Sequence, residues 1–363
     1  RFEEAEAEGD RARATYFESL VRQNNDGSYD ALLQGNAFLE VETSQPGFDV
    51  TVYRFTEQNR RLVPVEVTEL GRTPIARTML PHGSYVLDLE REGFAPIRLP
   101  VNLGRFEERR VRVQVYERSA VPDDFIVIAG GEFLSGEVQP LDLESNLARV
   151  GDFAIQRHPI TYSEYLGFLN DLVETDPERA VAHAPRIDDR GLYFGRDENG
   201  HFRLPDEDAE GDQPGLDWPV AMVSFYDAQA YAQWRSERDS KSFRLPTELE
   251  WEKAARGVDG RLYPWGDHFD ASFCKMKEST REKPLPSPIG HFEVDRSPYG
   301  AIDMAGNVIE WTTTSTGDSD ERKVIQGASF NSIAMMCRLD WNMDADPDTN
   351  LPYIGFRLAL SLS

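Results

Sequence analysis

The stretch RLPTELEWEKAARG, residues 244–257, decides how the second half of this chain folds. Its pattern predicts the start of a helix, in which Thr247 is the N-cap residue and Glu250 completes a capping box three residues later. Glu248 and Glu250 then lie at the positive end of the helix dipole, where carboxylates stabilise a helix. We therefore expect these acids to support the helix start rather than carry out catalysis, and Trp251 to pack inward.

Five further motifs follow along the chain: YPWGD (263–267), SPYG (297–300), DMAGNVIEW (303–311), QGASF (326–330) and GFRL (355–358). Together with the first stretch they resemble the sulfatase-modifying factor family, whose founding activity is that of the formylglycine-generating enzyme. The resemblance covers residues 121–363. It implies an α+β fold, a variant of the C-type lectin fold with a concave surface near the C-terminus. We expect Trp251, Trp265, Trp311 and Phe356 to be buried in this frame.

Two more helices and a hairpin are predicted before residue 244. Thr161 is an N-cap residue with Glu164 three residues later, which again forms a capping box. A second helix is expected after Ser224, because the apolar residues that follow it fall at helical spacing. Between these helices, residues 192–204 are typical of a hairpin that turns at residues 198–200.

The first third of the chain predicts a different architecture. Residues 1–34 indicate a connecting helix, and over residues 35–118 the hydrophobic period changes to two. Segments 38–42, 50–53, 85–89 and 111–115 are typical of strands, separated by Pro-Gly and Gly turns. We therefore expect a small all-β sandwich domain here. The runs at residues 44–50, 71–74 and 80–85 resemble the PEGA module that, in some bacterial serine/threonine kinases, lies between the kinase and a domain like the one that follows.

Composition and charge exclude several classes of function. The chain of 363 residues has a formal net charge of -25, which repels phosphate backbones and anionic lipids, so we expect no nucleic-acid and no membrane partner. No stretch approaches the roughly 18 apolar residues that span a bilayer. Two cysteines are too few for a disulfide framework, which favours a cytoplasmic location. Because the sequence opens at Arg1, we expect a piece of a longer protein, with an upstream kinase domain as one alternative.

The cysteine pattern argues against the parent activity. The resemblance implies that active enzymes bind copper(I) with two cysteines, three and eight residues beyond the serine of a Gly-Gly-Ser motif. That serine is Ser329 here, so the two positions hold Ser332 and Cys337, and the pair is broken. Counting back from Gly355 gives Cys337 a different register, and we interpret it as a small buried apolar residue. Cys274 lies in another segment and is no obvious replacement, so we expect no copper. If the chain is active, Cys337 and Ser329 are the candidate catalytic residues.

The resemblance also implies a structural calcium ion near the end of the DMAGNVIEW motif, residues 303–311. Its ligands would be Asn307, Val308 and Glu310, through side-chain and backbone oxygens, which suit a hard cation. The alternative is that these residues hydrogen-bond a loop without metal. A second calcium site of the active enzymes is not predicted, because Ser272 stands where that site needs an asparagine. The six histidines are isolated along the chain, which argues against an iron site.

The segment between the last two motifs is the candidate binding surface. Its predicted ligand-binding residues are Phe330, Asn331, Ser332, Met335, Asp340, Trp341, Asn342, Met343 and Asp344, in a region of irregular, Asn- and Asp-containing sequence. Such a mixture suits a non-catalytic module that binds an unknown protein or small molecule. It fits a kinase-associated sensor region or the variable protein of a diversity-generating retroelement. Two alternatives stay open: Met335 and Met336 fill the core, or the chain is a copper-dependent oxidase of the formylglycine-generating type.

Overall fold

The structure is a computed structural model that describes residues 35–137, 146–187, 191–317 and 321–362, with isolated residues between 16 and 33. The predicted connecting helix of residues 1–34 therefore lies almost entirely outside the described residues. The chain forms two compact units, and neither is continuous in sequence. Unit 1 contains Arg1–Pro122, Val127–Asp152 and Gly257–Arg261; unit 2 contains Asp123–Ile126, Phe153–Arg256 and Leu262–Ser363. Within the described part, no helix has the length and apolar character that crossing a bilayer requires.

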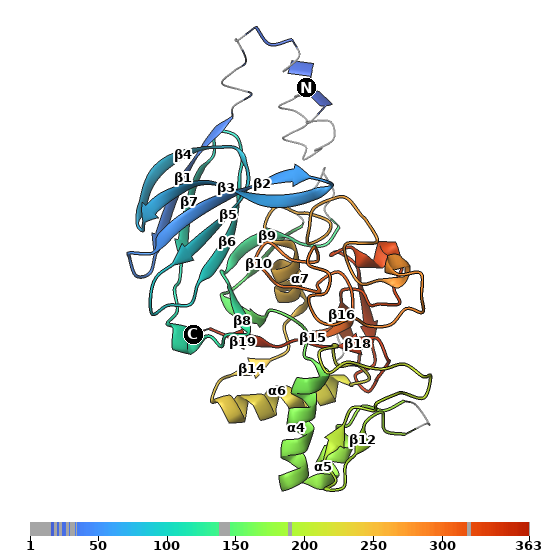
Figure 1. The fold of residues 1–363 in the computed structure, drawn as a ribbon. Coiled ribbons are helices and arrows are strands. Elements are labelled where there is room, and N and C mark those ends of the chain that lie inside the picture. Colours follow the sequence, from blue (N-terminus) through green and yellow to red (C-terminus); the bar gives the residue numbers. More distant parts are fainter. Residues whose placement is uncertain are drawn as a thin grey trace. The chain divides into compact units, whose positions relative to one another are not determined.

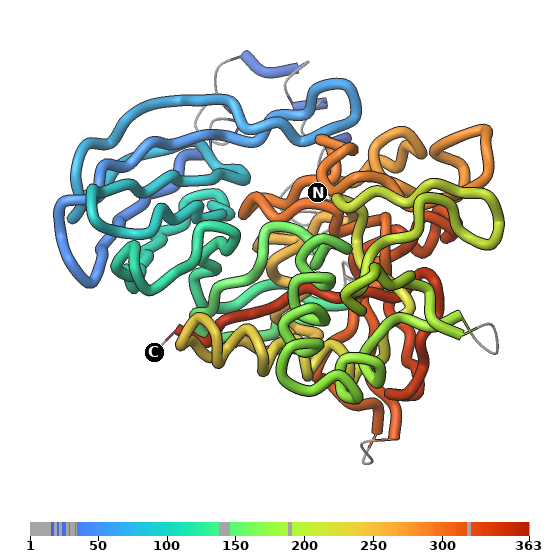
Figure 2. Tube along the Cα trace, turned by 60° about the horizontal axis from the view of Figure 1, so that its bottom comes forward, coloured from blue at the N-terminus to red at the C-terminus, as the bar shows by residue number. Residues whose placement is uncertain are grey.

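Unit 1 is built from strands, whose paths run beside one another in Figure 2. One sheet has the order β4-β1-β7 and the other the order β3-β2-β5-β6. The strands are β1 (Asn36–Thr43), β2 (Asp49–Gln58), β3 (Arg61–Arg72), β4 (Ile75–Pro81), β5 (Gly83–Glu90), β6 (Ile97–Leu103) and β7 (Glu108–Val113), followed by the 3-10 turn η1 (Arg118–Ala120). A separate hairpin pairs β9 (Gly131–Leu134) with β10 (Leu147–Val150).

The alternation that predicted strands in unit 1 is an alternation of burial. Ala37, Leu39 and Val41 of β1 are all fully buried, while the residues between them are partly exposed. The predicted segments fall on β1, β2, β5 and β7, so the β-rich N-terminal region is confirmed. The pattern did not predict β3, β4 and β6, because charged residues and proline interrupt their alternation.

Unit 2 combines helices with two small sheets and a hairpin, as the predicted α+β class requires (Figure 1). Its sheets have the orders β14-β19-β11-β8 and β17-β16-β15-β18, and β12 pairs with β13 at the predicted hairpin. The helices are α4 (Tyr162–Thr175), α5 (Pro177–Ala182), α6 (Phe225–Asp239) and α7 (Glu248–Arg256), with 3-10 turns η3 (Lys277–Ser279) and η4 (Ala334–Cys337). The strands are β8 (Phe125–Ile128), β11 (Phe153–Gln156), β12 (Gly195–Arg196), β13 (Phe202–Arg203), β14 (Phe243–Arg244), β15 (Ile309–Ser315), β16 (Lys323–Gln326), β17 (Asn342–Ala345), β18 (Ile354–Gly355) and β19 (Ala359–Ser361).

Both predicted capping boxes are present. The backbone N–H of Glu164 donates to Thr161 Oγ1 over 3.2 Å, and Glu164 Oε2 accepts the backbone N–H of Thr161 over 2.8 Å. Thr247 and Glu250 repeat these two bonds at the start of α7, with the same distances. Each box satisfies backbone donors that the first turn of a helix leaves without partners.

Three of the sequence motifs meet at one buried carboxylate, that of Glu310 on β15. Its Oε2 atom accepts the indole N–H of Trp251 over 2.9 Å and Nε of Arg357 over 2.7 Å. Its Oε1 atom accepts Nη2 of Arg357 over 2.8 Å. The side chains of Trp251, Glu310 and Arg357 are almost completely buried, and we refer to them as the Glu310 hub. Trp265, Trp311 and Phe356 are also buried, so all four predicted frame aromatics are confirmed.

Candidate binding surface

Three of the predicted ligand-binding residues lie at one edge of a sheet in unit 2. Asn342, Met343 and Asp344 form most of β17, which is an outer strand in the order β17-β16-β15-β18. Across this sheet Glu310 pairs with Gln326, and Gln326 pairs with Asn342. Directly opposed residues project from the same face of a sheet. One line of side chains therefore runs from the Glu310 hub to the predicted surface.

Exposure divides the predicted residues into three groups. Asn331, Met335 and Asn342 are exposed, and Phe330, Asp340, Trp341, Met343 and Asp344 are partly exposed. Met335 exposes 53% of its surface, so it does not fill the core. Ser332 is buried, and its hydroxyl oxygen accepts the backbone N–H of Ser329 over 2.9 Å. We refer to the exposed and partly exposed residues together as the C-terminal surface.

Two acidic residues of the C-terminal surface have cationic partners. Asp340 lies 2.5 Å from a guanidinium nitrogen of Arg338, and Asp344 lies 3.1 Å from one of Arg322. Asp344 also accepts the hydroxyl of Thr316 over 3.0 Å. These carboxylates therefore hold the segment in place, and their charge is not free to attract a ligand.

Glu248 on α7 and Gln326 on β16 join this surface although sequence reasoning did not assign them to it. Asn342 Nδ2 donates to Glu248 Oε1 over 2.6 Å, and Gln326 Nε2 reaches the same oxygen at 3.5 Å. Burial, and next the charge of Glu252, raise the pKa of Glu248. The only signal in the sequence was that both residues belong to family motifs, and Glu248 was interpreted there as a helix-stabilising acid.

Two polar atoms near the surface are buried without a hydrogen-bond partner among the described residues. They are the indole Nε1 of Trp341, which directly precedes β17, and Oε1 of Gln326. Leaving a buried polar group unpaired costs about 1 to 3 kcal/mol, so native proteins pair nearly all of them. A buried donor and a buried acceptor thus remain unpaired near this end of the sheet, among the residues that the structure describes.

The two cysteines, which sequence reasoning kept apart, are neighbours in the structure. Both are buried in one apolar cluster with Tyr263, Trp265 and Met276. Interaction with the Cys337 thiol, and next burial, hold the pKa of the Cys274 thiol well above its ordinary value, while the Cys337 Sγ atom lies 3.8 Å from the Ile333 carbonyl oxygen. The interpretation of Cys337 as a small buried residue is confirmed. Cys274 comes from another segment, and its place in the same cluster could not be predicted, because contacts across such a long separation leave no local pattern.

The predicted calcium ligands have protein partners. Asn307 Oδ1 accepts the backbone N–H of Ser287 over 3.0 Å, and its Nδ2 donates back to the Ser287 carbonyl over 3.0 Å. Both carboxylate oxygens of Glu310 accept hydrogen bonds from Arg357, which also neutralises the charge of Glu310. A cation would have to compete with Arg357, so this donor set fits calcium poorly. Binding of calcium by Asn307, Val308 and Glu310 remains a prediction.

Comparison with known families agrees with this architecture. The sulfatase-modifying factor enzyme 1-like domain matches residues 112–362, and the PEGA domain matches residues 56–118. Inactive C-alpha-formylglycine-generating enzyme 2 of Bos taurus is 34% identical over 176 residues, which cover 45% of this chain and 56% of that protein. The formylglycine-generating enzyme of Streptomyces coelicolor is 30% identical over 281 residues, which cover 64% of this chain and 87% of that enzyme.

Two further matches concern the wider setting. The serine/threonine-protein kinase pkn1 of Chlamydia pneumoniae is 29% identical over 192 residues, which cover 52% of this chain and 27% of the kinase. The solved structure of Treponema denticola variable protein 1 covers 65% of this chain and 94% of its own, with 19% identity and a TM-score of 0.44. The chain spans about half the length of the first curated relatives it matches, the inactive enzymes of Bos taurus and Mus musculus. The match over residues 112–362 shows that this chain belongs to the sulfatase-modifying factor enzyme 1-like family.

Proposed function

We propose that the C-terminal surface binds a ligand and that this chain does not make formylglycine. The observation that carries the proposal is the pair of unpaired buried atoms, Trp341 Nε1 and Gln326 Oε1. A ligand group that accepts from the indole, or one that donates to the amide, would satisfy one of them. Asn342, which is exposed and lies opposite Gln326, and the exposed Met335 offer adaptable polar and apolar contacts.

The state of the thiols supports a non-catalytic role. Copper(I) and substrate capture both require thiolates, because the thiolate is the ligand and the nucleophile. The raised pKa of Cys274 keeps its thiol neutral, and Ser332 holds a hydroxyl where the family pattern has the first cysteine. The similarity to proteins named inactive formylglycine-generating enzymes agrees with this reading.

The binding proposal is tested by selecting ligands first and then removing the two unpaired atoms. Displayed peptides would be selected on the wild-type protein, and the enriched peptides would be measured by calorimetry against Trp341→Phe and Gln326→Met. Each substitution keeps the bulk of the side chain, and we expect each to weaken binding about tenfold, or 1.4 kcal/mol. Tyr226→Ala, at an exposed aromatic on α6, is the matched control and should bind normally. Equal loss in all three variants would refute the assignment.

One observation favours the alternative activity, namely that Cys274 supplies Cys337 with a second thiol. Purified protein would be loaded with copper(I) and incubated under oxygen with a Cys-x-Pro-x-Arg peptide. We expect no formylglycine by mass spectrometry. Product that forms with the wild-type protein but not with Cys337→Ser would replace the binding proposal with an oxidase.

The proposal also covers the kind of protein in which this binding domain acts. Either the domain follows a kinase in a longer chain, or it is a retroelement variable protein. Comparison of genomic copies distinguishes these settings. Changes confined to adenine-rich codons of the C-terminal surface would identify the retroelement, and an upstream kinase reading frame would identify the other.

A further inference from the structure

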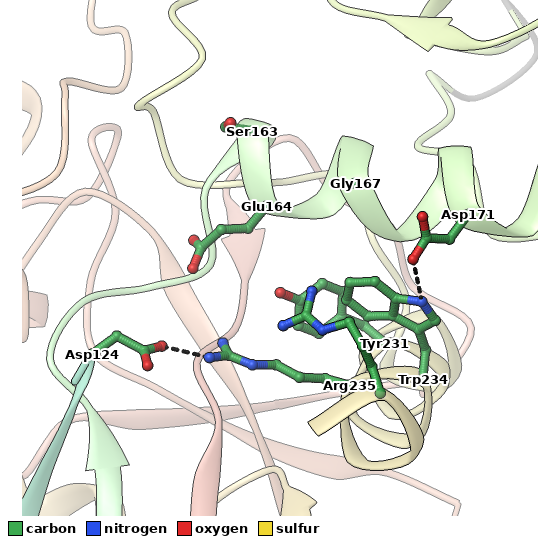
Figure 3. A pocket seen from close by; sticks show the side chains of 9 residues that line it. Asp124, Ser163, Glu164, Gly167, Asp171, Tyr231, Trp234 and Arg235 are labelled. Carbon is green, nitrogen blue, oxygen red and sulfur yellow. Dashed lines mark hydrogen bonds and ion pairs between the residues drawn. The ribbon is translucent and has the colours of Figure 1, made fainter. Parts of the chain in front are cut away.

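A cavity lies in unit 2 between α4 and α6, and no residue of the C-terminal surface lines it. The helices contact each other through aromatic rings: the Tyr165 and Tyr231 rings stack with their centroids 5.8 Å apart, and the Phe168 and Trp234 rings are tilted with their centroids 5.5 Å apart. Beside these contacts they enclose a pocket of about 390 Å³. Figure 3 shows Glu164, Gly167 and Asp171 along α4, facing side chains of α6. We refer to this cavity as the α4–α6 pocket.

Gly167 keeps one wall of this pocket open. It is exposed and lies in the interior of α4, where glycine is the least favourable residue after proline. A Cβ atom placed on it would meet nothing within 4 Å. Neither backbone crowding nor a positive φ therefore requires glycine here. What the missing side chain provides is space at the entrance of the pocket.

Arg235 and Asp124 form a rigid inner wall. Arg235 is almost fully buried, and its Nη2 atom donates to Asp124 Oδ2 over 2.9 Å. Its guanidinium lies 5.5 Å from the ring of Phe125 and 5.0 Å from that of Phe243. Asp239 completes the arrangement with a 3.3 Å ion pair. Asp239 also pairs with Arg238, so these two carboxylates and two guanidinium groups offset one another.

The opposite wall already holds a cation. The guanidinium of Arg238 lies 4.5 Å from the ring centroid of Trp234, a distance at which cation and ring attract. The indole N–H of Trp234 donates to Asp171 Oδ2 over 3.1 Å. Arg238 is exposed, but its Nε and Nη2 atoms also donate to Asp239 over 2.7 and 3.1 Å, so a ligand has to displace it from the ring. The indole face thus shows which kind of group this wall accepts.

The remaining charge of the pocket is negative. Asp124 and Asp239 are paired with Arg235 and Arg238. By contrast, Glu164 and Asp171 form no ion pair with any residue that the structure describes. Oε2 of Glu164 is used by the capping box and its other oxygen has no described partner. Burial, and next the charge of Glu164, raise the pKa of Tyr231, so this phenol stays neutral and does not alter the balance.

We propose that the α4–α6 pocket binds a cationic group, a protonated amine or a guanidinium, between the carboxylates of Glu164 and Asp171 and the indole of Trp234. The ring attracts the charge and supplies apolar contact, while the carboxylates accept its N–H donors. The opening at Gly167 admits it. The group is carried either by a free small molecule or by the side chain of a partner protein.

Calorimetry at low salt with acetyl-arginine amide tests the proposal. Acetyl-citrulline amide has the same shape without the charge and should not bind. Glu164→Gln keeps the capping box and should weaken arginine amide binding at least fivefold, as should Trp234→Ala. Gly167→Leu should abolish binding without lowering the melting temperature, because leucine is the better helix former. Arg238→Ala, which frees the indole face, should bind the amide more tightly.

A control separates the pocket from the acidity of the whole chain. Glu178→Gln removes one exposed carboxylate of α5 that does not line the pocket. If it weakens binding as much as Glu164→Gln does, long-range attraction explains the result and the proposal fails. Binding of the citrulline compound, or binding that survives Gly167→Leu, would overturn it as well. Agmatine and an arginine-containing pentapeptide then distinguish the source: tighter peptide binding points to a partner protein, and equal affinity to a free amine.

Discussion

The Glu310 hub and the C-terminal surface share one sheet but differ in how completely their polar atoms are hydrogen-bonded. At the hub, the carboxylate of Glu310 receives three hydrogen bonds and the side chains are buried. Two strands away, Trp341 Nε1 has no partner among the described residues. Gln326 lies between them, opposite both Glu310 and Asn342. A buried cluster whose donors are all hydrogen-bonded should lose stability when it is substituted, whereas a sheet edge with an unpaired donor can accept a ligand.

The largest effect is expected from breaking the hub. Arg357→Met removes the cation and leaves Glu310 charged and buried. The free energy of unfolding should therefore fall by about 3 to 5 kcal/mol relative to the wild type. Urea unfolding followed by tryptophan fluorescence measures it. Arg322→Met is the matched control, because it breaks the exposed pair with Asp344 and should cost about 1 kcal/mol or less. If the two variants lose similar amounts of stability, the Glu310 hub and the C-terminal surface do not differ in their contribution to folding.

A smaller loss is expected at Asn307, which joins the hub motif to Ser287. Asn307→Ala leaves the Ser287 N–H and carbonyl without their side-chain partner, so it should destabilise by about 1 to 3 kcal/mol. Asn307 also has φ of 72°, a backbone region that alanine adopts less readily than asparagine. Differential scanning calorimetry with excess calcium and with chelator adds the metal test. If calcium raises the melting temperature of the wild type but not of Asn307→Ala and Glu310→Ala, the calcium site is established.

The helix starts offer an intermediate test of the frame. Thr247→Ala removes the hydroxyl that accepts the Glu250 N–H and should lower the free energy of unfolding by about 1 kcal/mol. Thr280→Ala, at an exposed threonine outside the helices, serves as the control. Equal stabilities of the two variants would mean that the capping box contributes nothing measurable.

Sequence reasoning predicted what depends on local pattern. The capping residues Thr161 and Thr247 and the buried Trp251 each follow from spacing within one segment. Gly327 shows why a motif glycine is needed: its φ is 82°, and a Cβ atom there would meet Trp251 at 3.0 Å. What escaped prediction depends on long-range contact.

The missed features show this limit most clearly. Cys274 meets Cys337 because two distant loops pack in one cluster. The α4–α6 pocket combines residues of two helices with Asp124 from a third segment. Only the interior glycine of α4, with Ser163 and Asp171 one turn away on either side, could have pointed to it. Of the predicted binding residues, Asn342, Met343 and Asp344 share one sheet edge, whereas Ser332 is buried and its hydroxyl oxygen accepts the Ser329 backbone N–H.

The smallest effect on stability is expected for Trp341→Ala, and it contrasts sharply with the effect expected for Trp251→Ala. Trp251→Ala removes a buried ring and its bond to Glu310, which should cost about 3 to 5 kcal/mol. Trp341 is only partly buried and its N–H has no described partner, so Trp341→Ala should change the free energy of unfolding by about 1 kcal/mol or less. The same change should weaken a ligand selected on the wild type by about 2 kcal/mol, near thirtyfold, as expected of an aromatic anchor. Urea unfolding and calorimetry on one protein preparation measure both quantities. If Trp341→Ala unfolds the domain as Trp251→Ala does, this edge of the sheet is frame, and the spare donor of Trp341 has no bearing on binding.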